Sequence, residues 1–191
     1  MINRTPAPAA YDPRDEIITH LPALRAFARG LTGDLSMADD LVQETVLKAW
    51  SKFEQFRVGS NLRAWLFTIL RNTYMSARRK RAKEVADSEG SFAAQMATKP
   101  DHDGRLAMQE LNAALNRLPV EQREALLLVG ALGFSVEEAA ETCGCAPGTI
   151  KSRANRGRKA LAELLKLEDG EYLESTDNSV AAVMAVAPTG F

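Results

Sequence analysis

Apolar residues recur at three- and four-residue steps along most of the chain, which is the pattern of amphipathic helices. This spacing predicts helices over residues 14–32, 36–53, 62–86, 106–118 and 119–129. Two further helices are expected, a short one that begins after Ser135 and a longer one that begins at Pro147. No segment alternates apolar and polar residues in the way a half-buried strand does. The sequence therefore predicts an all-α fold.

Residues that begin and end helices refine this picture. Pro22 lies inside the first apolar repeat and should kink that helix or split it in two. Ser36, with Asp39 three residues later, is expected to cap the second helix.

Further along the chain, Ser135 and Glu138 form a capping box, Gly144 supplies a turn, and Pro147 begins the next helix. A short helix, a turn glycine and a longer helix in this order predict a helix-turn-helix unit.

Charge is distributed unevenly along the chain. The 24 Lys and Arg residues nearly balance the 25 Asp and Glu residues, but basic residues prevail in 14–86 and 105–167. The stretch 87–104 is acidic and rich in Ser, Gly and Ala, and 168–191 has acidic but no basic residues. We therefore expect two small helical domains that bind anions, joined by a flexible linker over 87–104. Residues 1–13 are expected to be a disordered arm, and 168–191 a disordered tail that could shield the basic domains.

Several protein classes are excluded by composition. The only cysteines, Cys143 and Cys145, exclude a disulfide scaffold, and with His20 and His102 far away in sequence they do not form a zinc motif. No apolar run approaches the ~20 residues of a membrane span, and the N-terminus has no secretory signal pattern. We expect a cytoplasmic protein that does not bind a membrane.

Catalysis is not expected, because the sequence has no glycine-rich phosphate loop, nucleophile elbow or zinc motif. One alternative is a nuclease or recombinase in which Asp39, Asp40 and Glu44 hold Mg²⁺, but no His or Lys cluster accompanies them. We therefore predict no cofactor, no metal and no small-molecule substrate. The cysteines could sense oxidation, although packing is the favoured interpretation because no nearby charge obviously activates a thiolate.

The helix that begins at Pro147 carries five basic residues before its first acid, Glu163. One face combines hydroxyl and guanidinium groups, and further basic residues flank it: Thr149, Ser152, Arg153 and Arg156, with Lys151, Arg158 and Lys159. A helix of this kind fits the DNA major groove, where arginine pairs with guanine edges and lysine with phosphates. The alternative is a solvated cationic surface helix, which the capping box and the turn glycine make less favoured.

Several long motifs resemble those of bacterial sigma factors. The sequences LPVEQRE at 118–124, GFSVEEAA at 133–140 and GTIKSR at 148–153 look like sigma region 4. The sequences DDLVQET at 39–45 and NLRAWLFTI at 61–69, followed by Arg71 and Asn72, look like region 2. The resemblance covers about residues 14–167 and is to the two-domain extracytoplasmic-function (ECF) sigma factors. The run GSNLRAWLF at 59–67 looks closest to the general-stress-response subgroup.

This resemblance implies core RNA polymerase and promoter DNA as partners. The region 2 helix of the family binds the clamp helices of the polymerase β′ subunit, and region 4 binds the β flap. In this chain the clamp-binding face would consist of Asp39, Asp40, Gln43, Glu44 and Lys48. A small anti-sigma protein that inserts between the two domains is also implied.

The resemblance further assigns promoter contacts. A loop would capture an unstacked base of the −10 element, and the following helix would hold phosphates: Phe56, Arg57, Gly59, Ser60 and Asn61, then Arg63, Arg71, Asn72, Arg78 and Arg79. Phe67 or Tyr74 could stack on a base, although both could instead pack in a core. Arg153 is the best candidate for base contact in the −35 element. Promoters of the subgroup resemble GGAAC at −35 and GTT at −10.

Two other functions stay open at this point. A helix-turn-helix regulator would bind DNA without polymerase and would not need the first domain. A sigma mimic would titrate an anti-sigma factor without initiating transcription, and it should lack the recognition-helix arginines that this chain keeps at 153 and 156.

Overall fold

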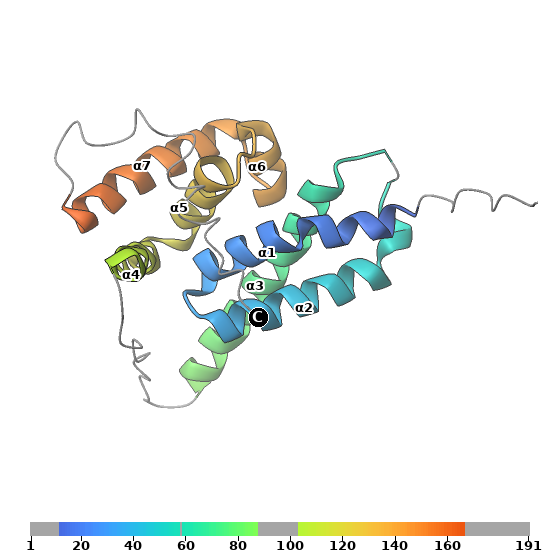
Figure 1. The fold of residues 1–191 in the computed structure, drawn as a ribbon, viewed down its shortest axis with the longest axis horizontal. Coiled ribbons are helices and arrows are strands. Elements are labelled where there is room, and N and C mark those ends of the chain that lie inside the picture. Colours follow the sequence, from blue (N-terminus) through green and yellow to red (C-terminus); the bar gives the residue numbers. More distant parts are fainter. Residues whose placement is uncertain (1–11, 58, 88–102, 167–191) are drawn as a thin grey trace, which may run out of the picture.

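The computed structural model describes residues 12–57, 59–87 and 103–166, and every regular element in these ranges is helical (Figure 1). The elements are η1 (Pro13–Glu16), α1 (Ile17–Thr32), α2 (Leu35–Ser51), η2 (Phe53–Gln55), α3 (Leu62–Asp87), α4 (Asp103–Arg117), α5 (Val120–Ala125), η3 (Leu126–Ala131), α6 (Val136–Cys143) and α7 (Pro147–Leu165). The predicted all-α fold is confirmed.

Helices α1, α2 and α3 form the first module. Helices α1 and α2 are neighbours in sequence and pack along each other, and α3 packs against both (Figure 1). The apolar faces meet in a core that includes Leu24, Phe27, Leu31, Leu66 and Leu70, all fully buried. The C-terminal part of α3 extends beyond this core, and its residues 76–84 are exposed.

Helices α4 to α7 form the second module. Helix α5 continues into η3, a π-helical turn that the sequence pattern did not predict. Helix α7 packs against α5 and α6, with Ile150 fully buried. Gly157 allows the close approach of α7 to α5, because a Cβ there would lie 2.9 Å from Leu126 Cδ1 and 3.2 Å from the Gln122 carbonyl oxygen.

The two modules pack against each other through what we call the module interface. Helix α1 contacts α4, α5 and η3, and α3 contacts α6. The rings of Phe67 in α3 and Phe134, which precedes α6, lie 4.8 Å apart between centroids. Gly30 of α1 faces Leu127 of η3 so closely that a Cβ would lie 2.7 Å from the leucine methyls. The buried residues of the two modules thus form one continuous core.

Some predicted helix boundaries were wrong. Pro22 does not split the first helix in two, because α1 is continuous from Ile17 to Thr32, and the alternative of a kink stays a prediction. The second helix is capped by Asp34, whose carboxylate accepts a hydrogen bond from the Met37 amide at 2.8 Å, and the box expected at Ser36 does not form. Pro119 is the N-cap of α5 and its first helical residue is Val120.

The helix-turn-helix signals are confirmed. The Ser135 hydroxyl accepts from the Glu138 amide, and the Glu138 carboxylate accepts from the Ser135 amide. Gly144 has φ +65°, the left-handed conformation that glycine adopts without strain. Helix α7 begins at Pro147 without a side-chain cap. Most of the expected arm, most of the expected linker and all of the expected tail lie outside the described residues.

Candidate nucleic-acid interface

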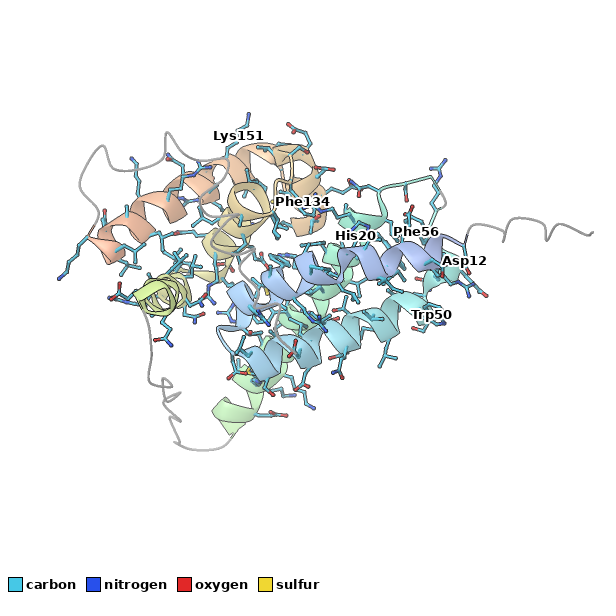
Figure 2. All side chains as sticks on the ribbon, viewed as in Figure 1. Asp12, His20, Trp50, Phe56, Phe134 and Lys151 are labelled. Atoms are coloured by element: carbon cyan, nitrogen blue, oxygen red, sulfur yellow. The ribbon has the colours of Figure 1, made fainter. Side chains whose placement is uncertain are left out.

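Helix α7 presents its polar face away from the first module. Lys151, Ser152, Arg156 and Lys159 are exposed, and Figure 2 shows Lys151 pointing outward from the helix. The Arg156 guanidinium donates back to the Ser152 carbonyl oxygen at 3.3 Å, which holds it along the helix surface. Thr149 and Arg158 are half-buried. The predicted set therefore forms a largely exposed cationic face on one rigid helix.

Arg153 is less exposed than its predicted role suggests. It is half-buried, and its Nη1 lies 3.8 Å from the Cys145 sulfur. Arg153 thus places a positive charge beside Cys145, which the sequence did not reveal. Burial raises the pKa of the Cys143 thiol to about 12, with a further contribution from the Glu124 carboxylate. Cys143 is thus a thiol at neutral pH and packs in the core.

The loop before α3 is only partly available to a nucleotide. Arg57, Gly59 and Ser60 are exposed, and Gly59 has φ +87°. Phe56 was expected in the base pocket but is 7% exposed and packs against Phe53 and Trp65, so this assignment is not supported by the structure. Phe56 is the C-cap of η2, and its ring centroid lies 5.2 Å from that of Trp65 in α3.

Asn61 has two structural tasks. Its Oδ1 accepts from the Ala64 amide and so caps α3. Its Nδ2 donates to the Glu138 carboxylate of α6 at 2.7 Å.

The side chains predicted on α3 divide into two groups. Asn72, Arg78 and Arg79 are exposed. Arg63 and Arg71 instead bind the second module, with Arg63 donating to the Leu132 carbonyl oxygen and Arg71 pairing with Glu124. Both side chains are therefore already paired in this arrangement of the modules, and their contact with phosphates stays a prediction. Sequence periodicity did not reveal this, because it does not show which module covers which face.

The aromatic residues proposed for base stacking are also occupied. Phe67 is fully buried between Phe27 and Phe134, so its role as a stacking platform is excluded in this arrangement. Tyr74 is half-buried, and its hydroxyl donates to the Leu31 carbonyl oxygen at 2.9 Å.

Helix α2 exposes a polar face that also carries two large apolar residues. Asp39, Asp40, Gln43 and Glu44 are exposed, whereas Lys48 is half-buried and donates to the Thr73 hydroxyl. Two of the acids have cationic neighbours, since Asp39 lies 3.6 Å from Arg25 and Glu44 lies 2.6 Å from Lys48.

The apolar residues are Leu47, 71% exposed, and Trp50, 56% exposed, which lies at the outer edge of α2 in Figure 2. The exposure of these two residues was not predicted from the sequence. A signal was present, because Leu47 is seven residues after Asp40 and so falls on the polar face.

Within residues 12–57, 59–87 and 103–166, no group of three or more His, Cys, Asp and Glu side chains could hold a metal ion. In the same part of the chain, no helix is long and apolar enough to cross a bilayer.

Comparison with known proteins identifies the family. Residues 17–84 match the family model of Sigma-70 region 2, and residues 108–161 match that of Sigma-70 region 4. The chain is 52% identical over 171 residues to the ECF RNA polymerase sigma factor EcfG of Rhodopseudomonas palustris, covering 90% of this chain and 94% of the relative. The chain belongs to the ECF RNA polymerase sigma factors. It is therefore a sigma factor that directs core RNA polymerase to promoters, and its family is not a class of enzymes.

Solved structures share the fold of this sigma factor. The sigma factor RpoE from Bartonella quintana, solved in complex with the anti-sigma factor NepR, has a TM-score of 0.74 and 53% identity, covering 82% of this chain and 98% of that one. The PhyRSL–NepR complex from Sphingomonas sp. Fr1 has a TM-score of 0.61 and 22% identity, covering 85% and 96%, which shows the fold alone. The region 2 match distinguishes the chain from a helix-turn-helix regulator that lacks this domain.

Two adjacent charged residues of the sigma factor lie in the module interface. Arg123 is 7% exposed and donates to the carbonyl oxygens of Leu31, Asn116 and Leu118 and to Asn116 Oδ1. Burial lowers the pKa of Arg123 from its ordinary value, but the group stays charged at neutral pH. Glu124 is fully buried, and its burial raises its pKa even though the Arg71 guanidinium opposes this effect. Neither burial could be predicted from the sequence.

Proposed function

We propose that the outer face of α2 is the polymerase-binding surface of this sigma factor. Asp40, Gln43 and Glu44 supply exposed polar groups beside the exposed Leu47 and Trp50. Large apolar side chains on a rigid exposed helix, surrounded by charges, are typical of a protein interface. The charges would orient the partner, and the apolar pair would supply most of the binding energy. The partner would be the clamp helices of the polymerase β′ subunit, and the second module would contact the β flap.

We infer that α7 reads the −35 element. The observation that supports this most strongly is the exposed cationic face of α7, which follows a correctly capped α6 and a left-handed turn glycine. Ser152 and Arg156 would face base edges, with Lys151 and Lys159 on phosphates. Arg153 would join them by turning away from Cys145. Thr149 and Arg158 complete the proposed set.

The −10 element would be bound by the first module. Arg57, Gly59 and Ser60 form the exposed loop, and Asn72, Arg78 and Arg79 form an exposed basic surface along α3. The second module contacts three further side chains of this surface. They would become available to the −10 element when that module moves away: Asn61, Arg63 and Arg71. An unstacked base of the −10 element could approach Gly59 closely, because glycine has no side chain. The space beside it is open, since a Cβ built at this position would meet no atom within 4 Å.

The cellular setting follows from the relatives. The Bartonella relative was solved in complex with the anti-sigma factor NepR, and we propose that this chain too is controlled by a small anti-sigma protein in a general stress response. It would act in the cytoplasm and perform no covalent chemistry itself. The two modules would correspond to residues 14–86 and 105–167, joined by a linker over 87–104, with an arm over 1–13 and a tail over 168–191.

Run-off transcription tests this function. Purified core polymerase and the chain are incubated with a template that carries GGAAC at −35 and GTT at −10. We expect a transcript of defined length, which is lost when either element is scrambled. Arg156→Ala should reduce the transcript, whereas the matched change of an exposed arginine on α4, Arg117→Ala, should leave it unchanged. Equal transcription from intact and scrambled templates would refute the proposed function.

A further inference from the structure

We propose that Arg14 is a positioning residue for polymerase binding, because it holds the exposed Trp50 indole in one orientation before the partner arrives. This inference rests on the proposed role of the outer face of α2. It adds the short helix η1, which precedes α1, to the elements that build that surface. Arg14 acts through Trp50 and not through a contact of its own with the polymerase.

The guanidinium of Arg14 lies against two aromatic rings. Its central carbon is 5.5 Å from the centroid of the Trp50 ring and 5.3 Å from that of the Phe53 ring. Both distances are within the ~6 Å over which a cation is attracted to an aromatic face, and tryptophan is the best partner of this kind. The Arg14 guanidinium thus connects an exposed ring, Trp50, to a buried one, Phe53.

Phe53 gives the guanidinium a fixed support. Its ring packs against those of Phe56 and Trp65, with centroid distances of 5.5 Å and 6.1 Å. Figure 2 shows Phe56 and Trp50 at the same end of the first module. A ring that is enclosed by two others cannot turn freely, so the cation that rests on it is held in place as well.

The backbone of Arg14 is also held. Its amide donates to the Asp12 carboxylate at 2.9 Å, and its carbonyl oxygen accepts from the Ile17 amide. Ile17 is buried and anchors the start of α1 in the core. The Asp12 carboxylate also lies 3.8 Å from Arg14 Nε, an exposed ion pair of the kind that contributes little. Arg14 thus extends from a fixed backbone toward the two rings.

The pairing of α1 with α2 places this contact on the proposed polymerase face. Arg25 of α1 lies 3.6 Å from Asp39 of α2, which belongs to that face. Arg14 precedes Arg25 by as many residues as Trp50 follows Asp39, as expected for antiparallel helices in register. This separation is about three helical turns, so both contacts lie on the same side of the helix pair.

Trp50 is the residue that gains from this arrangement. More than half of its surface is exposed, so the protein confines its indole only in part. An exposed side chain exchanges between rotamers, and ordering it on binding costs affinity. A guanidinium against the indole removes part of that cost in advance and leaves the exposed part of the ring accessible to the partner.

Substitutions of Arg14 test the proposal. Arg14→Gln removes the cation, whereas Arg14→Lys keeps a cation that can also lie on an aromatic face. The matched control is Arg81→Gln. Arg81 is exposed in the same module, and its side chain lies beside Met37, at the other end of α2 from Trp50. Circular dichroism checks that each variant is folded.

Affinity is measured by competition with labelled wild-type chain for core polymerase, without DNA. Arg14→Gln should bind about two- to fivefold more weakly, the effect expected when one side chain is no longer ordered in advance. Arg14→Lys should recover part of this loss, and Arg81→Gln should bind like the wild type. In a Trp50→Ala background, Arg14→Gln should cause no further loss, because its effect passes through the indole.

The motion of Trp50 gives a second readout. The chain has two tryptophans, so Trp65→Phe leaves Trp50 as the only one, and time-resolved fluorescence anisotropy then follows its indole. In this background, Arg14→Gln should increase the amplitude of the fast component of the anisotropy decay. Arg14→Lys should increase it less, and Arg81→Gln should leave it unchanged.

The outcomes separate this proposal from the proposed function. If folded Arg14→Gln keeps the wild-type affinity or the wild-type motion of Trp50, the positioning role is overturned. An equal loss of affinity with and without the Trp50 indole would also overturn it, since Arg14 would then contact the polymerase directly. If Trp50→Ala itself binds core polymerase as tightly as the wild type, the proposed polymerase face of α2 is wrong.

Discussion

Arg123 is the charged residue whose loss should affect the fold most. Its guanidinium accounts for four hydrogen bonds, to the carbonyl oxygens of Leu31, Asn116 and Leu118 and to Asn116 Oδ1, at 2.7 to 3.3 Å. Leu31 belongs to α1, so Arg123 also connects the two modules. We consider Arg123→Met, which keeps much of the side-chain volume and removes every donor.

The expected loss of stability follows from these contacts. Hydrogen bonds to a charged group contribute about 1.5–3 kcal/mol each, but not all four count in full. The Leu31 oxygen keeps the hydrogen bond from Tyr74, and the bond to Leu118 is long at 3.3 Å. Part of the gain also offsets the cost of burying the guanidinium, which is the cause of its lowered pKa. We therefore expect the free energy of unfolding to fall by about 2–4 kcal/mol.

Urea unfolding with two probes measures this effect. Both tryptophans, Trp50 and Trp65, belong to the first module, so their fluorescence reports that module, while circular dichroism reports all helices. In the wild type the two transitions should coincide, because the modules share one core. In Arg123→Met, the dichroism transition should shift to lower urea and begin before the fluorescence transition.

The control is Arg117→Met, which changes an exposed arginine on α4 and should alter the unfolding free energy by less than about 0.5 kcal/mol. Arg123→Lys should lie between the two, since an ammonium keeps the charge but cannot reproduce the planar set of donors. If Arg123→Met unfolds within 0.5 kcal/mol of the wild type with coincident transitions, the reasoning about this buried guanidinium is refuted.

Three further predictions concern binding and pH. Arg153→Ala should weaken −35 recognition by about 1–3 kcal/mol, measured by competition between intact and mutated −35 duplexes for the holoenzyme; equal competition would exclude a base contact. Trp50→Ala should lower the affinity for core polymerase by at least about tenfold, measured by titration of labelled chain, while the exposed Leu35→Ala at the other end of α2 should not. Glu124 has a raised pKa in the folded chain, so its contribution to stability is full at acidic pH and is lost as pH rises through that raised value. Glu124→Gln should remove this loss. The free energy of unfolding is measured for both proteins at several pH values between about 4 and 7, and the same pH dependence in both would contradict the prediction.

Local signals in the sequence predicted local structure well. The Ser135 and Glu138 pair, Gly144 and the proline at 147 specify the helix-turn-helix through contacts within a few residues, and all took the expected form. The start of α2 shows the limit of such signals. Both Asp34 and Ser36 are good caps. Asp34 takes the position, and its amide donates to the hydroxyl of Thr32, a residue that the capping pattern does not include.

Contacts between distant segments could not be predicted from periodicity. An arginine at the surface of a helix has the same pattern whether it faces solvent, as Arg78 does, or a carboxylate of another helix, as Arg71 does. The same applies to aromatic residues. Phe67 is buried against Phe134, which lies far along the chain, and Phe56 packs against Trp65 of α3. The two modules were predicted from charge and motif, but their packing depends on residues such as Gly30 that carry no local signal.

Permanganate reactivity of the −10 thymines is the most direct test that this chain directs polymerase to open promoters. Core polymerase and the chain together should make the thymines of GTT reactive on a template with both elements, and neither should do so alone. Scrambling GGAAC should abolish the reactivity, since α7 would no longer position the complex. Thymines that stay unreactive with the complete mixture, or react with core polymerase alone, would contradict the account.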